Sequence, residues 1–150
     1  MKILPDILFS TIESMAAWAS GKSMWPLSCG ISCCAIEMMH AAASRVDLDR
    51  LGCLFRSSPR HADLMIIAGT ITKKMLPKLR VLHDQMLSPK FVIAMGNCAI
   101  NGGLYAESES VISDINQFIP INLKLLGCPP TSNELASSIM TLQNEIRKIT

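Results

Sequence analysis

Two adjacent cysteines, Cys33 and Cys34, stand in the segment 25–39, and Cys98 and Cys128 each follow a short apolar run and a nearby glycine. Thiolates bind zinc and iron–sulfur clusters, so four of them can hold either kind of centre. Structural zinc sites usually carry their cysteines in pairs separated by about two to four residues. This chain instead has one contiguous pair and two distant single cysteines, a spacing that favours one iron–sulfur cluster held by a prebuilt fold.

Adjacent cysteines restrict the backbone that can present them. In an extended strand the two side chains point to opposite faces, so both reach one cluster only from helical or kinked backbone. The segment 33–44 is apolar enough to form a buried helix, with Cys33 and Cys34 at its first turn. Unpaired backbone N–H groups at that end should lower the pKa of a thiol and favour an anionic cluster.

The remaining cysteines, Cys29 and Cys53, are expected to be small buried residues. Cys29 also forms a Cys-x3-Cys spacing with Cys33, so it could compete as a ligand. Three disulfides are the alternative use of six cysteines, but residues 1–7 lack the apolar core of a secretory signal. The histidines show no pattern typical of catalysis, and no phosphate-binding or nucleophile motif is present. The residue types therefore favour electron transfer over bond-making.

Strands alternating with helices predict a mostly parallel α/β sheet, a flavodoxin-like or Rossmann-like three-layer fold. The carboxyl ends of parallel strands share one edge, where ligands bind. A short run, 53–55, lies within a polar connection and can form a further strand. The segments 21–32 and 99–109 are expected to be loops. The buried strands are expected at 62–68, 90–95 and 118–126, and the helices at 72–87, 110–117 and 131–148. The residues that follow these strands, and so converge, are 69–70, 96–98 and 127–128.

The composition fits one domain over residues 1–150, with 1–25 as an N-terminal helix and loop that docks peripherally. Hydrophobic residues make up 49% of the chain and charged residues 17%, which suggests that other subunits or a membrane surface cover part of it. Residues 3–20 have the pattern of an amphipathic helix. The net charge of +2 gives no reason to expect nucleic acid, and no stretch is long and apolar enough to cross a membrane.

Motifs of one family occur in the segments 28–39, 55–60 with 62–63, 68–72 with 74–75, 84–86 and 127–131. Together they resemble the B subunit of bacterial NADH:quinone oxidoreductase, which is respiratory complex I; the mitochondrial form is called PSST. The resemblance runs from about residue 10 to 147. Small subunits of nickel–iron hydrogenases are similar but generally space their first two ligands as Cys-x-x-Cys.

The resemblance implies that Cys33, Cys34, Cys98 and Cys128 bind the terminal [4Fe–4S] cluster, which passes electrons to quinone. It implies a peripheral subunit on the cytoplasmic face of the bacterial inner membrane, catalytic only within the NADH:quinone oxidoreductase, an ion-pumping translocase. The partners it implies are the large hydrogenase-like subunit, the ferredoxin-like subunit and the membrane-anchor subunits. The positions that match this side of the quinone pocket are Met38, Met39, Arg56, Arg60, Gly69, Thr70 and Met75.

The chain departs from the family pattern outside the four cysteines. Asn97 replaces a usual serine, Lys73 an asparagine and Leu126 a proline, and residues 104–109 replace a tyrosine-rich loop. These departures bear on docking against the ferredoxin-like subunit and on the cluster potential. Two alternatives follow: the small subunit of a membrane-bound nickel–iron hydrogenase-type complex, or a zinc-stabilised or metal-free scaffold that does no redox work.

Overall fold

A parallel sheet lies at the centre of the computed structural model, which describes residues 12, 14–16 and 18–148. Its strands lie side by side in chain order, and each pairs in parallel with the next. The α/β fold predicted from the alternation of strands and helices is therefore confirmed. The strands are β1 (Pro26–Gly30), β2 (Leu64–Ala68), β3 (Phe91–Met95) and β4 (Leu123–Leu125).

The outer edge of β1 pairs with the short run that the sequence suggested as a strand. Isolated parallel bridges join Met24 to Cys53 and Leu27 to Arg56, without forming a continuous strand. If this run is numbered as the second strand in the chain, β2, β3 and β4 become the third, fourth and fifth. The order across the sheet is then 2-1-3-4-5, the order of flavodoxin-like folds. The connections after β1 and β2 therefore leave toward opposite faces, and the switch point lies between these two strands.

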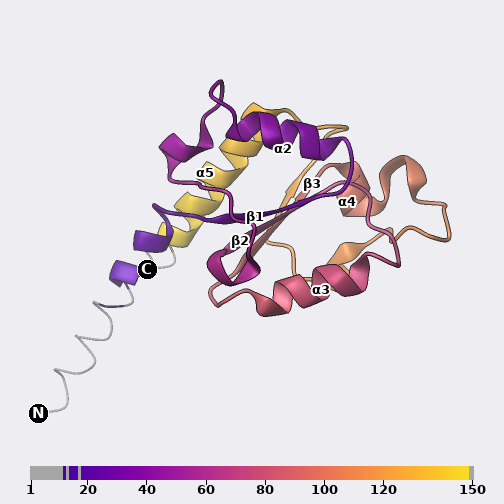
Figure 1. Cartoon of the computed structure of the whole chain (residues 1–150), viewed down its shortest axis with the longest axis horizontal. Coiled ribbons are helices and arrows are strands. Elements are labelled where there is room, and N and C mark those ends of the chain that lie inside the picture. The colour runs from indigo at the N-terminus through magenta and orange to yellow at the C-terminus, as the bar shows by residue number, and fades with distance from the viewer. Residues whose placement is uncertain (1–11, 13, 17, 149–150) are drawn as a thin grey trace, which may run out of the picture.

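Helices cover both faces of the sheet (Figure 1). The helices α2 (Cys34–Ala42) and α5 (Ser132–Lys148) pack on one face, and α3 (Leu76–Gln85) and α4 (Asn97–Asn101) on the other. Because both faces are covered, all residues of β2 are buried. The short 3-10 helices are η1 (Leu48–Leu51), η2 (Pro59–His61), η3 (Gly103–Tyr105) and η4 (Ile115–Gln117).

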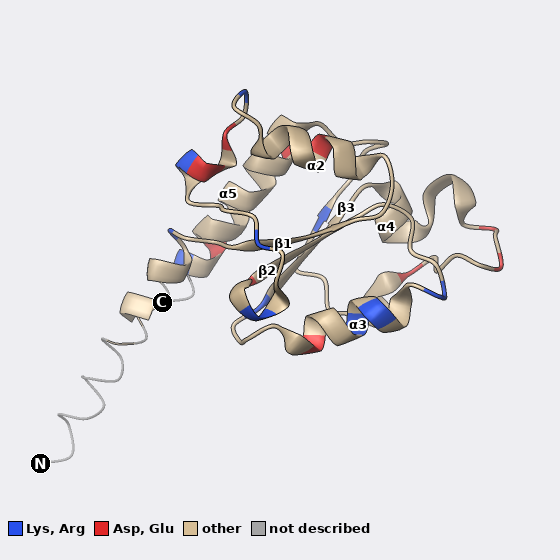
Figure 2. Ribbon diagram, viewed as in Figure 1, with Lys and Arg blue, Asp and Glu red and all other residues tan. Residues whose placement is uncertain are grey.

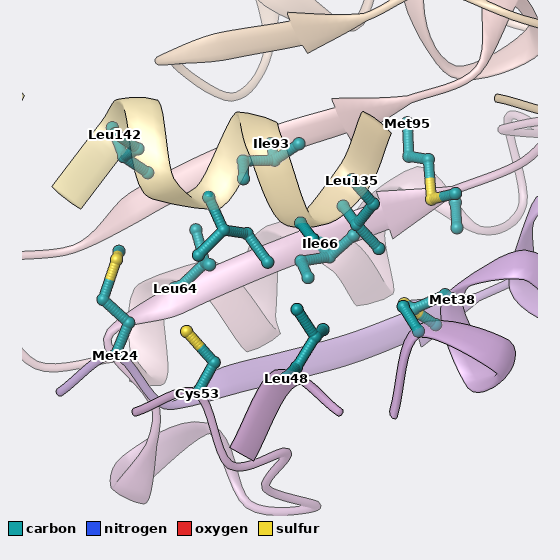
Figure 3. Packing of buried hydrophobic residues seen from close by; sticks show 14 of the residues in the cluster. Met24, Met38, Leu48, Cys53, Leu64, Ile66, Ile93, Met95, Leu135 and Leu142 are labelled. Atoms are coloured by element: carbon teal, nitrogen blue, oxygen red, sulfur yellow. The ribbon is translucent and has the colours of Figure 1, made fainter. Parts of the chain in front are cut away.

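The core on the α2 and α5 side is built from aliphatic side chains of the sheet and these helices. Leu64 and Ile66 of β2 lie between Leu48 on one side and Leu135 of α5 on the other (Figure 3). Contacts of this kind exclude water from the sheet face and hold the strand ends in fixed positions. This packing supports the edge from which the cysteine-bearing segments leave.

Three local predictions were wrong. The segment predicted as a loop at 21–32 contains β1, because pairing with β2 overrides the loop-like composition and Pro26 stands first, where it removes no interior ladder bond. The predicted loop 99–109 overlaps α4 and η3, and the predicted helix 110–117 is reduced to η4. The last predicted strand is shorter than expected, because its ladder with β3 covers only β4 and a turn in which the Ile121 N–H donates to Asn116 Oδ1 takes up the preceding residues.

The predicted N-terminal helix lies mostly outside the described residues. Residues 12, 14–16 and 18–20 are helical, and the side chains of Ile12, Met15 and Trp18 are exposed. Within the described ranges, none of the helices has the length and apolar character needed to span a bilayer.

The central strand should dominate stability. Ile66 is 0% exposed, so Ile66→Ala should lower the free energy of unfolding by about 2–5 kcal/mol through lost burial and the cavity left behind. Ile36 of α2 is 64% exposed, and the same substitution there should change stability by about 0.5 kcal/mol or less. Urea unfolding of the two variants of the full chain tests this. Equal losses at both positions would contradict the packing described here.

Candidate metal centre

The cysteine-bearing segments all leave the sheet at the carboxyl ends of its strands. Cys33 caps the N-terminus of α2 and Cys34 is the first residue of that helix, just after β1. Cys98 lies in α4, which follows β3, and Cys128 lies just after β4. Cys34 and Cys98 are buried, whereas Cys33 and Cys128 are exposed.

The electrostatic surroundings of Cys34 show how close these thiols lie. The pKa of Cys34 is raised to about 11, mainly by burial and in addition by the charges of Cys33, Cys98 and Cys128. Repulsion of this kind falls off with distance, so the other three thiols lie around Cys34. The expectation that the helix N-terminus lowers the pKa is wrong for Cys34, because desolvation and neighbouring thiolates outweigh the backbone N–H groups.

Glycine at position 96 makes this closeness possible. Gly96 has φ +90°, and a Cβ added there would lie 2.5 Å from Cys34 Sγ and 3.6 Å from the Gly127 carbonyl oxygen. Any side chain would therefore displace the Cys34 sulfur or the backbone beneath it. Because Gly96 has no Cβ, the end of β3 can pass directly under Cys34.

The thiols do not surround one point. Among the residues that the structure describes, no group of three or more His, Cys, Asp or Glu side chains is arranged to hold a single metal ion. A cubane cluster is bound differently, since each of its four thiolates binds a different iron. Four thiols on segments that meet at one edge, with a glycine cradle beside Cys34, have the donor chemistry that such a cluster needs.

The other two cysteines lie apart from this group. Cys29 of β1 packs with the core on the α3 side, while Cys34 belongs to the core on the α2 side. Cys53 is buried and accepts a hydrogen bond from Gln143 Nε2 at 3.6 Å. Burial raises the pKa of both thiols to about 11. Both cysteines thus have the surroundings of structural residues.

The residues expected on the quinone side fall into separate places. Met38 and Met39 line a groove of about 520 Å³ between α2 and β1, together with Ala35 and Phe55. Arg56 follows the groove residue Phe55 in the sequence, but its guanidinium lies 3.9 Å from the centre of the Trp25 ring. The Arg56 Nε is buried without a hydrogen-bond partner.

The rest of that set lies elsewhere. Gly69 and Thr70 contact Ser32, whose Oγ accepts a hydrogen bond from the Thr70 N–H at 3.3 Å. Met75 caps α3 and packs against the core on that side. Arg60 is exposed and lines a different cavity, of about 310 Å³, with His61. The assignment of all seven residues to one quinone pocket stays a prediction.

A link between α2 and α5 was missed by sequence reasoning. Glu37 Oε2 accepts a hydrogen bond from the Ser132 N–H at 3.1 Å, and Ser132 Oγ lies 3.3 Å from His40 Nδ1. The carboxylate and the hydroxyl both approach Nδ1 of His40, whereas a catalytic triad uses the two ring nitrogens for its two partners. The i,i+3 spacing of Glu37 and His40 was the available signal.

The amino-acid sequence of residues 32–142 matches the family described as the NADH ubiquinone oxidoreductase 20 kDa subunit. The chain belongs to this family. The resemblance found in the motifs is thereby confirmed at the level of the family, and the protein is of a kind that works as a subunit of oxidoreductase complexes.

Two solved structures are similar to this member of the 20 kDa-subunit family. One match is a chain of the membrane-bound sulfane sulfur reductase, an archaeal respiratory membrane complex. It is 33% identical, has a TM-score of 0.87, and covers 91% of this chain and 77% of that one. Another is the NAD⁺-reducing [NiFe]-hydrogenase in the H₂-reduced state. It is 17% identical, with a TM-score of 0.63 over 82% of this chain and 92% of that one, so it supports the fold alone.

The pKa values predict slow alkylation of the two structural cysteines. At pH 8, a pKa raised from 9.0 to about 11 lowers the thiolate fraction about 100-fold. Cys29 and Cys53 of the native, metal-stripped chain should therefore react with iodoacetamide at least about 100-fold more slowly than an unfolded thiol. Their rates should increase as the pH rises toward 11.

Mass spectrometry of the alkylated peptides measures each rate, with exposed Cys128 as the internal reference. The raised pKa also means that these thiols favour the folded chain below about pH 9, and that this contribution is lost as the pH rises toward 11. If Cys29 or Cys53 reacted at pH 8 as fast as Cys128, its assignment as a protected structural residue would be wrong.

Proposed function

We propose that this chain is the electron-transfer subunit of a membrane-associated oxidoreductase complex and binds one [4Fe–4S] cluster through Cys33, Cys34, Cys98 and Cys128. The observation that carries the proposal is that Cys33, Cys98 and Cys128 lie close enough to Cys34, at the carboxyl edge of the sheet, to raise its pKa. Membership of the 20 kDa-subunit family supports the redox role. Residues 1–150 are proposed to form a single iron–sulfur domain, with 1–25 docking peripherally.

The bound cluster would supply one-electron transfer, and the chain's own residues would set its surroundings. Burial of Cys34 and Cys98 keeps water from one side of the site, while Cys33 and Cys128 leave the other side accessible. Because the Cys34 thiol has a pKa of about 11, it is protonated at neutral pH and must release its proton when it becomes a ligand.

The proposed electron acceptor is quinone, bound between this chain and the large hydrogenase-like subunit. The groove lined by Met38 and Met39 has the size of a small-molecule site and apolar walls that suit a quinone ring. It lies along α2, the helix whose first residue is Cys34, so the proposed donor and acceptor share one rigid element. Methionine adapts well to flat apolar ligands.

The outer surface of α2 supports a protein partner at the same place. Ile36 and Met39 are each 64% exposed, and the helix carries no Lys or Arg (Figure 2). Exposed apolar side chains on a helix of this kind fit the large subunit as the covering partner. The ferredoxin-like subunit would deliver electrons and the membrane anchor would hold the assembly at the cytoplasmic face of the inner membrane. The translocase assignment, NADH:quinone oxidoreductase, belongs to this proposal.

A second candidate is a related complex with another redox partner. The 33% identical match in a sulfane sulfur reductase favours an acceptor other than quinone, and the hydrogenase-type small subunit has the same fold. Metal analysis and acceptor assays of the purified complex separate these options. Nickel would favour the hydrogenase type, and reduction of polysulfide without reduction of quinone would favour the sulfur-reducing type.

The four proposed ligands should be individually required. Cys98→Ala and Cys128→Ala should each abolish the low-temperature electron paramagnetic resonance signal of a reduced [4Fe–4S] cluster in the anaerobically purified complex, because each removes one iron ligand. Cys53→Ala is the matched control, and it should keep the signal because Cys53 pairs with Met24 ahead of β1, at the end of the sheet opposite the proposed ligands. Loss of the signal in Cys53→Ala alone would refute the ligand assignment.

The groove assignment predicts a selective effect on quinone use. Met39→Gln keeps the length of the side chain but places an amide against the quinone ring. In the assembled complex it should raise the KM for a short-chain quinone about 10-fold. Met140→Gln, at a partly exposed methionine of α5, should leave the KM unchanged. Steady-state quinone reduction by both variants provides the measurement, and equal KM values for Met39→Gln and the unmodified complex would rule out this groove.

A further inference from the structure

The residues immediately before Cys98 and Cys128 are joined by a reciprocal pair of hydrogen bonds. The backbone N–H of Asn97 donates to the Gly127 carbonyl oxygen at 3.0 Å. The backbone N–H of Gly127 donates in return to Asn97 Oδ1 at 3.2 Å. The pair therefore ties together the two segments that carry these cysteines.

The pair continues the sheet beyond the point where the strands end. The register of β3 and β4 ends at Met95 and Leu125, and the Gly96 N–H donates to the Leu125 carbonyl oxygen at 2.8 Å. At Asn97 the chain turns into α4, so an ordinary ladder cannot go on. The side-chain oxygen of Asn97 replaces the backbone acceptor that an extended strand would have offered to Gly127.

The Cys34 sulfur lies beside the same junction. A Cβ on Gly96 would be within 3.6 Å of the Gly127 oxygen and 2.5 Å of Cys34 Sγ. A shift of the Gly127 segment would thus move Cys128 relative to both Cys98 and Cys34. Alanine at position 97 would leave the Gly127 N–H without its acceptor and remove the side-chain hydrogen bond between the Cys98 and Cys128 segments.

We propose that Asn97 is a positioning residue that holds the segments of Cys98 and Cys128 at the separation required for joint binding of one cluster. The inference rests on the proposed cluster-binding function and adds to it a residue that is not a ligand. Asparagine suits this position because its side-chain oxygen accepts from the Gly127 N–H while its backbone N–H donates to the Gly127 carbonyl oxygen. Groups that orient metal ligands in this way typically change metal retention by about 10–100-fold when removed.

The chain offers a control with the same chemistry. The Asn122 N–H donates to the Val92 carbonyl oxygen at 2.9 Å, and the Val92 N–H donates to Asn122 Oδ1 at 2.8 Å. This second pair joins the same two strands at their amino ends, opposite to the cysteine edge. A purely structural role for Asn97 would make the two asparagines equivalent, whereas a positioning role would not.

The experiment compares the full chain with Asn97→Ala, Asn97→Asp and Asn122→Ala, all purified anaerobically. Loss of cluster absorbance in excess chelator is timed, and hydrogen exchange of the Gly127 and Val92 amides is measured in the cluster-free chains. Asn97→Ala should lose its cluster about 10-fold or more faster than the unmodified chain, and Asn122→Ala within about 2-fold of it. Asn97→Asp keeps the acceptor oxygen and should stay within about 3-fold.

Exchange provides a readout that does not depend on the cluster. The Gly127 amide should lose protection in Asn97→Ala alone, and the Val92 amide in Asn122→Ala alone. Equal rates of cluster loss in Asn97→Ala and Asn122→Ala would overturn the inference and leave cluster binding intact. A folded Asn97→Asp variant that loses its cluster as fast as Asn97→Ala would also overturn the inference and leave cluster binding intact. An unmodified chain that binds no cluster would overturn the proposed function, and the inference with it.

Discussion

Parallel pairing of β1 to β4 determines where every cysteine-bearing segment begins. It brings residues separated by almost a hundred positions to one edge, because every strand ends there. Hydrogen bonds just past the strand ends keep the segments that follow the strands close together. The Ile31 N–H donates to the Ala68 oxygen, and the Gly96 N–H donates to the Leu125 oxygen. The absence of a Cβ at Gly96 then lets the Cys34 sulfur lie against the end of β3. These contacts are made by the backbone and by Gly96 of the chain itself.

The site is asymmetric in a way that suits an electron carrier inside a larger assembly. Cys34 and Cys98 face the interior, and Cys33 and Cys128 face outward. A cofactor held between them would be shielded on the sheet side and accessible from the side where another subunit can dock. The helix α2 links the two parts of the proposed function, because it begins at Cys34 and lines the apolar groove with Met38 and Met39.

Sequence patterns predicted those parts of the fold that depend on local burial. The β2 strand and α5 were predicted nearly to their bounds, because continuous apolar runs and the Thr131–Glu134 capping pair are local signals. The β1 strand was missed, since its proline, serine and glycine are typical of loops and only pairing with β2 makes it a strand. The hydrogen bonds of Asn97 to Gly127 and of Glu37 to Ser132 join residues far apart in the chain, and no spacing rule shows them. The raised pKa of Cys34 likewise follows from tertiary burial, whereas the helix position alone suggested the opposite.

Binding of one cluster by the four cysteines can be measured by chemical analysis of the anaerobically isolated protein. Iron and acid-labile sulfide are determined per chain, together with zinc and nickel, and Mössbauer spectra identify the iron species. We expect about four irons and four sulfides per chain in one cubane cluster, with cysteine as every protein ligand. Stoichiometric zinc, or a folded chain isolated from its complex without iron, would contradict it.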